Sequence, residues 1–257
     1  MTLVAALILG AVIGILLGLL GGGGSILAVP ALVYGLGLDL GQAVPISLLV
    51  IGIASVVGAL PKIRAHQVEW RLAGIFAAAG IPATFVGNAL GRLLPQPVVM
   101  IGFAIVMVAA GIRMLQERGE TGTACRAGES GINWRRCAPR SIPTGFAVGL
   151  LTGLFGVGGG FLIVPALVVM LGVEMSVAVG TSLVIIAANS AAGLVAHLSG
   201  VSIDWAITAA FAATAIIGSL AAGHLGANLD TGRLRRWFAY LVLVVATYVL
   251  VDTLFWS

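Results

Sequence analysis

Long stretches without any charged residue dominate the sequence. Asp, Glu, Lys and Arg are absent from positions 1–38, 40–61, 72–91, 93–112, 141–173, 175–203 and 205–232. A helix needs about 20 apolar residues to cross the hydrocarbon core of a bilayer, so several of these stretches can hold one span and the longest can hold two. A transmembrane β-barrel would instead show shorter segments of alternating hydrophobicity. The pattern predicts an all-α polytopic membrane protein.

The apolar segments fall into two sets of five. We place the first set near 2–20, 25–38, 41–61, 70–91 and 96–115, and the second near 142–156, 160–173, 176–198, 205–226 and 236–255. A hydrophilic loop, 116–141, joins a first repeat, 1–115, to a second repeat, 142–257. Three segments, 25–38, 142–156 and 160–173, are short for full spans at about 1.5 Å per residue. They are either tilted spans or re-entrant half-helices, so the sequence predicts eight to ten crossings.

The two sets are copies of one another. Shifting the sequence by 135 positions aligns it with itself without a gap, and 18 of the 34 pairs from 14/149 to 47/182 are identical. Pro30 aligns with Pro165 and Trp70 with Trp205, which an apolar composition alone does not explain. An odd number of segments in each repeat turns the second copy upside down, which is a common plan among transporters.

The positions of the basic residues agree with such an inversion. Lys62, Arg64 and Arg71 surround one loop of the first repeat, whereas the equivalent loop of the second, 197–205, has no Lys or Arg. In the next loop the bias reverses, with one arginine in the first repeat and three in the second. Because cytoplasmic loops collect Lys and Arg, we expect an inner-membrane protein with loop 116–141 in the cytoplasm and both termini outside. The net charge of +4 is then an orientation signal, and it does not indicate nucleic-acid binding.

Two cysteines, Cys125 and Cys137, lie in loop 116–141. A disulfide is disfavoured in a reducing compartment, and two thiolates without a nearby histidine do not make a zinc site. We therefore expect two free thiols and no metal site. The sequence has no H-E-x-x-H motif, no paired aspartates inside spans and no ATP-binding pattern G-x-x-x-x-G-K-[ST], so we expect neither an enzyme nor a cofactor.

Two glycine-rich breaks interrupt the apolar segments, GLLGGGGS at 18–25 and GLFGVGGG at 153–160. Glycine in a helix costs about 1 kcal/mol relative to alanine, and a broken helix at membrane depth survives only where its backbone is buried in protein or lines a polar cavity. Helices beginning at these breaks would present free N–H groups and a positive dipole end to an anion. Close helix packing by small residues is the alternative. The substrate-binding candidates here are Gly21, Gly22, Gly23, Gly24, Ser25, Gly156, Gly158, Gly159, Gly160 and Phe161.

Polar side chains inside the apolar segments are further candidates, because they are costly there. Their hydroxyls could donate to sulfonate or carboxylate oxygens. Alternatively, each serine bonds to a carbonyl of its own helix or joins two helices. An asparagine in a charge-free helix needs a partner, which also makes Asn88 a candidate. The set predicted to bind substrate is Ser47, Thr181, Ser182, Asn189 and Ser190.

The pattern G-x-x-G-G-G-G-x-x-x-x-V-P-A-L at 18–32, with its second copy GLFGVGGGFLIVPAL at 153–167, resembles the sulfite exporter TauE/SafE family. The resemblance covers nearly the whole chain. It implies a polytopic inner-membrane permease that moves sulfite, sulfonates such as sulfoacetate, or related organosulfur or carboxylate anions, usually outward.

We therefore expect a secondary transporter that exports a small sulfur-containing anion by alternating access, with an anion channel or a carboxylate permease as alternatives. An inside-negative potential drives an anion outward by about 2.3 kcal/mol per charge per 100 mV, so export needs no coupling ion. The expected partners are the small anionic substrate and the lipid bilayer, without nucleic acid. A homodimer is one option for the assembly.

Overall fold

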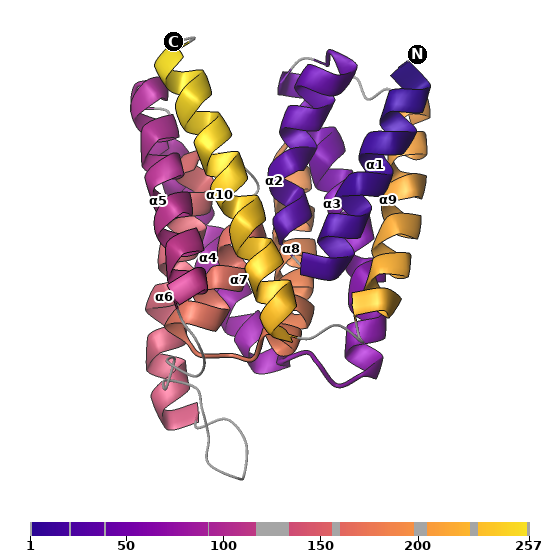
Figure 1. Cartoon of the computed structure of the whole chain (residues 1–257). Coiled ribbons are helices and arrows are strands. Elements are labelled where there is room, and N and C mark those ends of the chain that lie inside the picture. Colours follow the sequence, from indigo (N-terminus) through magenta and orange to yellow (C-terminus); the bar gives the residue numbers. More distant parts are fainter. Residues whose placement is uncertain are drawn as a thin grey trace.

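The protein is a bundle of helices in which the two halves of the chain interlock (Figure 1). The computed structural model describes residues 2–20, 22–38, 40–91, 93–116, 134–155, 160–197, 205–226 and 231–255. In the first half the helices are α1 (Thr2–Leu20), α2 (Gly23–Pro30), α3 (Leu40–Arg64), α4 (Trp70–Gly91) and α5 (Gln96–Gln116). In the second half they are α6 (Trp134–Phe155), α7 (Gly160–Pro165), α8 (Met175–His197), α9 (Trp205–Gly226) and α10 (Thr231–Phe255). The described ranges contain no strand, which confirms the all-α prediction.

Helices α2 and α7 are the short segments that follow the glycine-rich breaks. Each continues into a π-helical segment, Ala31–Gly35 after α2 and Ala166–Met170 after α7. Both segments are followed by a glycine with φ of 69°, Gly37 and Gly172, in the left-handed region that glycine adopts without a Cβ penalty. Each glycine donates its N–H to the carbonyl four residues earlier, and the next residue donates to the carbonyl six residues earlier. Both bonds span one residue more than those of a Schellman termination, as fits the end of a π-helical segment.

Helix α6 is longer than the apolar pattern indicates. It begins at Trp134, whereas the predicted segment begins at 142, so the last part of the predicted loop 116–141 is helical. The sequence WRRCAPRS at its start is polar, and a pattern of apolar residues locates spans without reporting helical turns beyond them. Cys137 lies in this extension and is disulfide-bonded, which makes the expectation of two free thiols wrong. Cys125 lies outside the described residues.

Several helices are long and apolar enough to cross a membrane. By length and composition, the stretches Gln42–Arg64, Trp70–Gly91, Val98–Gln116 and Met175–Leu194 qualify among the described residues. Shorter apolar helical stretches run over Val4–Leu20, Ile207–Ala222 and Arg236–Val251. These helices support a multi-pass membrane protein.

The most extensive helix–helix contacts each join a helix of the first half to a helix of the second. Helix α1 packs on α9, and α4 packs on α6; α3 packs on α8, and α5 packs on α10. Glycines allow the closest approach, since Gly14 lies against the backbone of Ala215 and Gly149 lies against that of Gly80. The 135-residue shift converts the first of these contacts into the second. The two interfaces are therefore built from equivalent residues, and these glycines serve packing.

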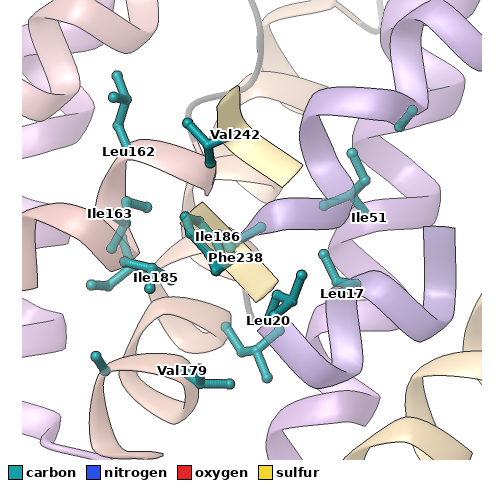
Figure 2. Close-up of a cluster of buried hydrophobic side chains, with 14 of the residues drawn as sticks. Leu17, Leu20, Ile51, Leu162, Ile163, Val179, Ile185, Ile186, Phe238 and Val242 are labelled. Carbon is teal, nitrogen blue, oxygen red and sulfur yellow. The ribbon is translucent and has the colours of Figure 1, made fainter. Parts of the chain in front are cut away.

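The buried core extends across both halves. Figure 2 shows large apolar side chains from five helices in one cluster: Leu17, Leu20, Ile51, Leu162, Ile163, Val179, Ile185, Ile186, Phe238 and Val242. They belong to α1, α3, α7, α8 and α10. This core holds the short helix α7 against the long helix α8, so closely packed residues follow directly after the second glycine-rich break.

Candidate functional site

A cavity of about 240 Å³ lies between the halves. Its walls come from α2, α3 and α4 of the first half and from α6 and α8 of the second. None of the described residues that line it is charged. The polar side chains in its wall are Ser25, Ser47, Thr84, Asn88, Thr152, Asn189 and Ser190.

The first turns of α2 and α7 touch beside this cavity. Ser25 is 1% exposed, and its hydroxyl donates to the carbonyl of Gly22 at 2.7 Å. A Cβ added to Gly160 would lie 2.6 Å from Ser25 Oγ. Ser25 and Gly160 occupy equivalent positions in the two repeats. The two broken helices therefore meet at their starts, and only a residue without a side chain fits at position 160.

Most hydroxyl groups in the cavity wall donate their protons to the backbone. Ser47 donates to the carbonyl of Val44 at 2.7 Å, and Thr152 donates to that of Val148 at 2.7 Å. The Thr84 hydroxyl lies 2.8 Å and 3.1 Å from the carbonyls of Gly80 and Gly149. A hydroxyl has one proton to donate but two lone pairs. Ser47 therefore makes the bond to a carbonyl of its own helix that is the alternative to donation to an anion, and its role toward a substrate stays a prediction.

Asn189 differs from these hydroxyls. Its Oδ1 atom is enclosed by protein and has no hydrogen-bond partner among the described residues. A buried acceptor without a donor is destabilising by about 1 to 3 kcal/mol, and such an atom in a native structure calls for an explanation. Its neighbour Ser190 is buried. Both residues lie in the cavity wall on α8. Helix α4 contributes Asn88 and Thr84 to the same wall.

The other predicted site residues that the structure describes are not part of the cavity wall. Thr181 and Ser182 are fully buried; the Thr181 hydroxyl accepts the N–H of Glu69 at 3.0 Å, and the Ser182 hydroxyl donates to Val179 at 2.8 Å. A Cβ on Gly24 would lie 2.6 Å from the carbonyl oxygen of Ile13 in α1, so Gly24 serves helix packing.

The remaining glycine-rich residues are placed as follows. Gly22 is buried and accepts the Ser25 hydroxyl. Gly23 begins α2, and Phe161 is the second residue of α7. The residues outside the described ranges are Gly21, Gly156, Gly158 and Gly159. The structure thus brings Ser25, Ser47, Asn189 and Ser190 together at one cavity.

Two cavity residues, Thr84 and Thr152, are absent from the set that the sequence predicts. Both are polar residues in apolar segments, which is the signal that identifies Ser47. Thr152 aligns with Leu17 in the first repeat, so a search for matched polar pairs passes over it. Thr84 aligns with Ser219, whose hydroxyl instead donates to the carbonyl of Ala54 at 3.2 Å.

Comparison with known proteins agrees with this architecture. A protein of Xylella fastidiosa (strain Temecula1) described as a probable membrane transporter protein is 35% identical over 254 residues, covering 94% of this chain and 92% of that one. Another, probable membrane transporter protein YunE of Bacillus subtilis, is 29% identical over 247 residues, covering 90% of this chain and 89% of its own. No solved structure matches the chain. The model of the family described as sulfite exporter TauE/SafE matches residues 6–249, and the chain therefore belongs to this family of membrane transporters.

Proposed function

We propose that the protein is a secondary transporter that exports a small sulfur-containing anion, such as sulfite or a small sulfonate, across the inner membrane by alternating access. The observation that carries this proposal is a cavity of about 240 Å³ whose wall is shared by the two halves and includes several polar but, among the described residues, no charged side chains. A volume of this order suits a ligand of few heavy atoms, since pockets for drug-sized ligands begin at about 300 Å³. The family name supports a sulfur-containing anion as its substrate.

An inverted repeat supports alternating access. A Cβ added to Gly193 would lie 3.2 Å from Leu48 Cδ1, and one added to Gly58 would lie 3.8 Å from Leu183 Cδ1. The 135-residue shift turns the first contact into the second. Since Leu48 lies near Gly193 while Gly58, further along α3, lies near Leu183, earlier along α8, the two helices run in opposite directions. In Figure 1, α1 begins at the upper end of the bundle, whereas its counterpart α6 begins at the lower end. Inverted halves around one central site are the arrangement in which rocking exposes the site to each side in turn.

The orientation in the membrane follows from charge. The end of α3 carries Lys62 and Arg64, and the start of α10 carries Arg233, Arg235 and Arg236. With these basic ends in the cytoplasm, both termini lie outside, and the connection between α5 and α6 lies inside. In this orientation, the inside-negative membrane potential drives an anion out of the cell.

Counterflow in proteoliposomes tests the proposal. Purified protein, reconstituted with unlabelled sulfite inside, should accumulate labelled sulfite transiently and with saturation. A conductance without saturation would indicate a channel, and the absence of any flux would contradict transport of this anion.

The matched variants are neighbours on α8. Asn189→Leu removes the amide from the cavity wall and should lower counterflow at least tenfold. Ala191→Leu adds the same side chain at an exposed position outside that wall and should transport as the unmodified chain does. Equal loss in both variants would show that the effect reports helix packing and would remove Asn189 from the site.

A further inference from the structure

Lys62 is a buried cation without a counter-charge. It belongs to the last turn of α3 and is 4% exposed, whereas its neighbours Arg64 and His66 are exposed. No hydrogen bond or ion pair joins its ammonium to any of the described residues, but the protein does not fully enclose this group. An unpaired charge is costly to bury, and a lysine that serves only to orient the protein in the membrane has no need of burial. The position of Lys62 therefore calls for another explanation.

The Lys62 side chain leaves α3 toward α8. A Cβ added to Gly180 in α8 would lie 3.1 Å from Lys62 Cβ. The segment after α3 folds back over this point, since Gln67 donates its N–H to the Lys62 carbonyl at 2.8 Å and places its own carbonyl against Gly180. Glu69 then donates its N–H to the Thr181 hydroxyl of α8 at 3.0 Å. Lys62 thus lies between the two helices that also line the cavity.

Lys62 also lies on the face of α3 that lines the cavity. The cavity-lining residues of this helix run from Val44 to Ile51. Lys62 follows Val44 by 18 positions, or about five turns at 3.6 residues per turn, and it follows Ile51 by about 16 Å at 1.5 Å per residue. Ser55 and Gly58 continue this face between them. Ser55 is fully buried, with a hydroxyl that has no partner among the described residues, and Gly58 packs on α9, so the route from Lys62 to the cavity is closed in this structure.

The two repeats differ in charge at this position. The 135-residue shift pairs Lys62 with His197, the last residue of α8. Histidine, unlike lysine, is mostly neutral near pH 7. In the orientation proposed above, the lysine lies at the cytoplasmic end of the α3–α8 pair and the histidine at the outer end. A fixed positive charge at the cytoplasmic end raises the local concentration of anions, where export begins.

We propose that the Lys62 ammonium binds the transported anion at the cytoplasmic end of the bundle, before the anion reaches the cavity. The ligand class is a small oxyanion, such as sulfite or a small sulfonate, whose oxygens supply the acceptors that the ammonium lacks. A lipid phosphate offers the same oxyanion chemistry, and the test below separates the two sources. The inference rests on the proposed function and its orientation, because it places the first binding step of export at Lys62.

Uptake of labelled sulfite into inverted membrane vesicles, whose cytoplasmic face is outside, tests the inference. Lys62→Met keeps the length of the side chain and removes the charge. It should raise the apparent KM for sulfite about tenfold, as the loss of one hydrogen bond to a charged group does, with little change in the maximal rate. Lys62→Arg keeps the charge and should keep most of the affinity. Arg64→Met removes an exposed charge from the same helix end and should leave the KM within about twofold of its original value.

Thermal stability separates ligand binding from a structural role. Replacing an unpaired buried charge with an apolar side chain should leave the melting temperature in detergent unchanged or raise it. A clear fall in Lys62→Met would show that Lys62 stabilises the fold and would overturn the inference. A melting temperature that rises with added phosphatidylglycerol in the unmodified chain, but not in Lys62→Met, together with equal KM values, would assign the ammonium to a lipid phosphate and would also overturn it.

The outcomes distinguish this inference from the proposed function. An unchanged KM in Lys62→Met, whatever its maximal rate, or an equal increase in Lys62→Met and Arg64→Met, overturns the role of Lys62 while leaving anion transport in place. Absence of saturable sulfite uptake by the unmodified chain contradicts the proposed function, and with it the inference that rests on it.

Discussion

Ser25 and Gly160 are in contact although they lie 135 positions apart, and each is the counterpart of the other in the internal repeat. A residue that touches its own symmetry equivalent must lie close to the axis that relates the two halves. In the inverted repeat proposed above, the pseudo-twofold axis would pass between the first turns of α2 and α7. Ser25 also lines the cavity, so this axis would run beside the proposed substrate site, where both halves could act on one ligand.

The contact on the axis leaves no room for a side chain at position 160. In Gly160→Ala the new Cβ would lie 2.6 Å from Ser25 Oγ and 2.9 Å from Ile186 Cδ1. Overpacking of this kind destabilises by about 1 to 3 kcal/mol, and we expect a lower melting temperature in detergent. Adding Ser25→Ala removes the closest atom and should restore part of the stability. Independent, additive effects of the two substitutions would contradict the contact.

Two glycines of α4 provide a matched test of helix packing. A Cβ at Gly87 would collide with the backbone of Leu150 and Leu154 in α6, whereas a Cβ at Gly74 would meet nothing within 4 Å. Gly87→Ala should therefore separate α4 from α6 and lower the melting temperature by several degrees. Gly74→Ala should leave it unchanged or raise it slightly, since alanine favours a helix. Similar melting temperatures for the two variants would argue against this interface.

Gly24 provides a test that separates packing from substrate binding. A valine there would push its side chain into the backbone of α1 near Ile13 and Leu17. We expect Gly24→Val to reduce the yield of monodisperse protein in size-exclusion chromatography, in contrast to Asn189→Leu, which should elute normally and transport poorly. A well-folded Gly24→Val protein without transport would instead restore Gly24 to the substrate site.

The sequence predicts the helices well because each is an apolar stretch between charges. Helices α1, α4 and α9 begin and end where the hydrophobic pattern indicates. The extension of α6 to Trp134 is missed, because a polar helical turn outside the hydrocarbon carries no apolar signal. The internal repeat is visible in the sequence, and Gly14 and Gly149, which it aligns, make equivalent packing contacts.

The site is harder to predict than the fold. A run of glycines looks the same whether the missing Cβ makes room for a ligand or for another helix, so the sequence cannot separate Ser25, at the cavity, from Gly24, packed against α1. Likewise, Ser47 and Ser182 are equivalent in sequence, but only Ser47 lines the cavity. Whether a hydroxyl donates to a ligand or to a nearby carbonyl depends on the local backbone geometry. The spacing of residues in the sequence does not indicate this geometry.

Accessibility of the cavity from both sides of the membrane tests the central claim most directly. Ser190→Cys, in a chain whose Cys125 and Cys137 are replaced by serine and which still transports, places one thiol in the cavity wall. A membrane-impermeant, sulfonate-bearing methanethiosulfonate should modify this thiol from inside and from outside in separate experiments. An excess of methanesulfonate, a small sulfonate that does not react with the reagent, should protect the thiol in both. Modification from neither side or from one side only, or labelling that methanesulfonate does not slow, would contradict a central cavity that opens alternately to the two faces.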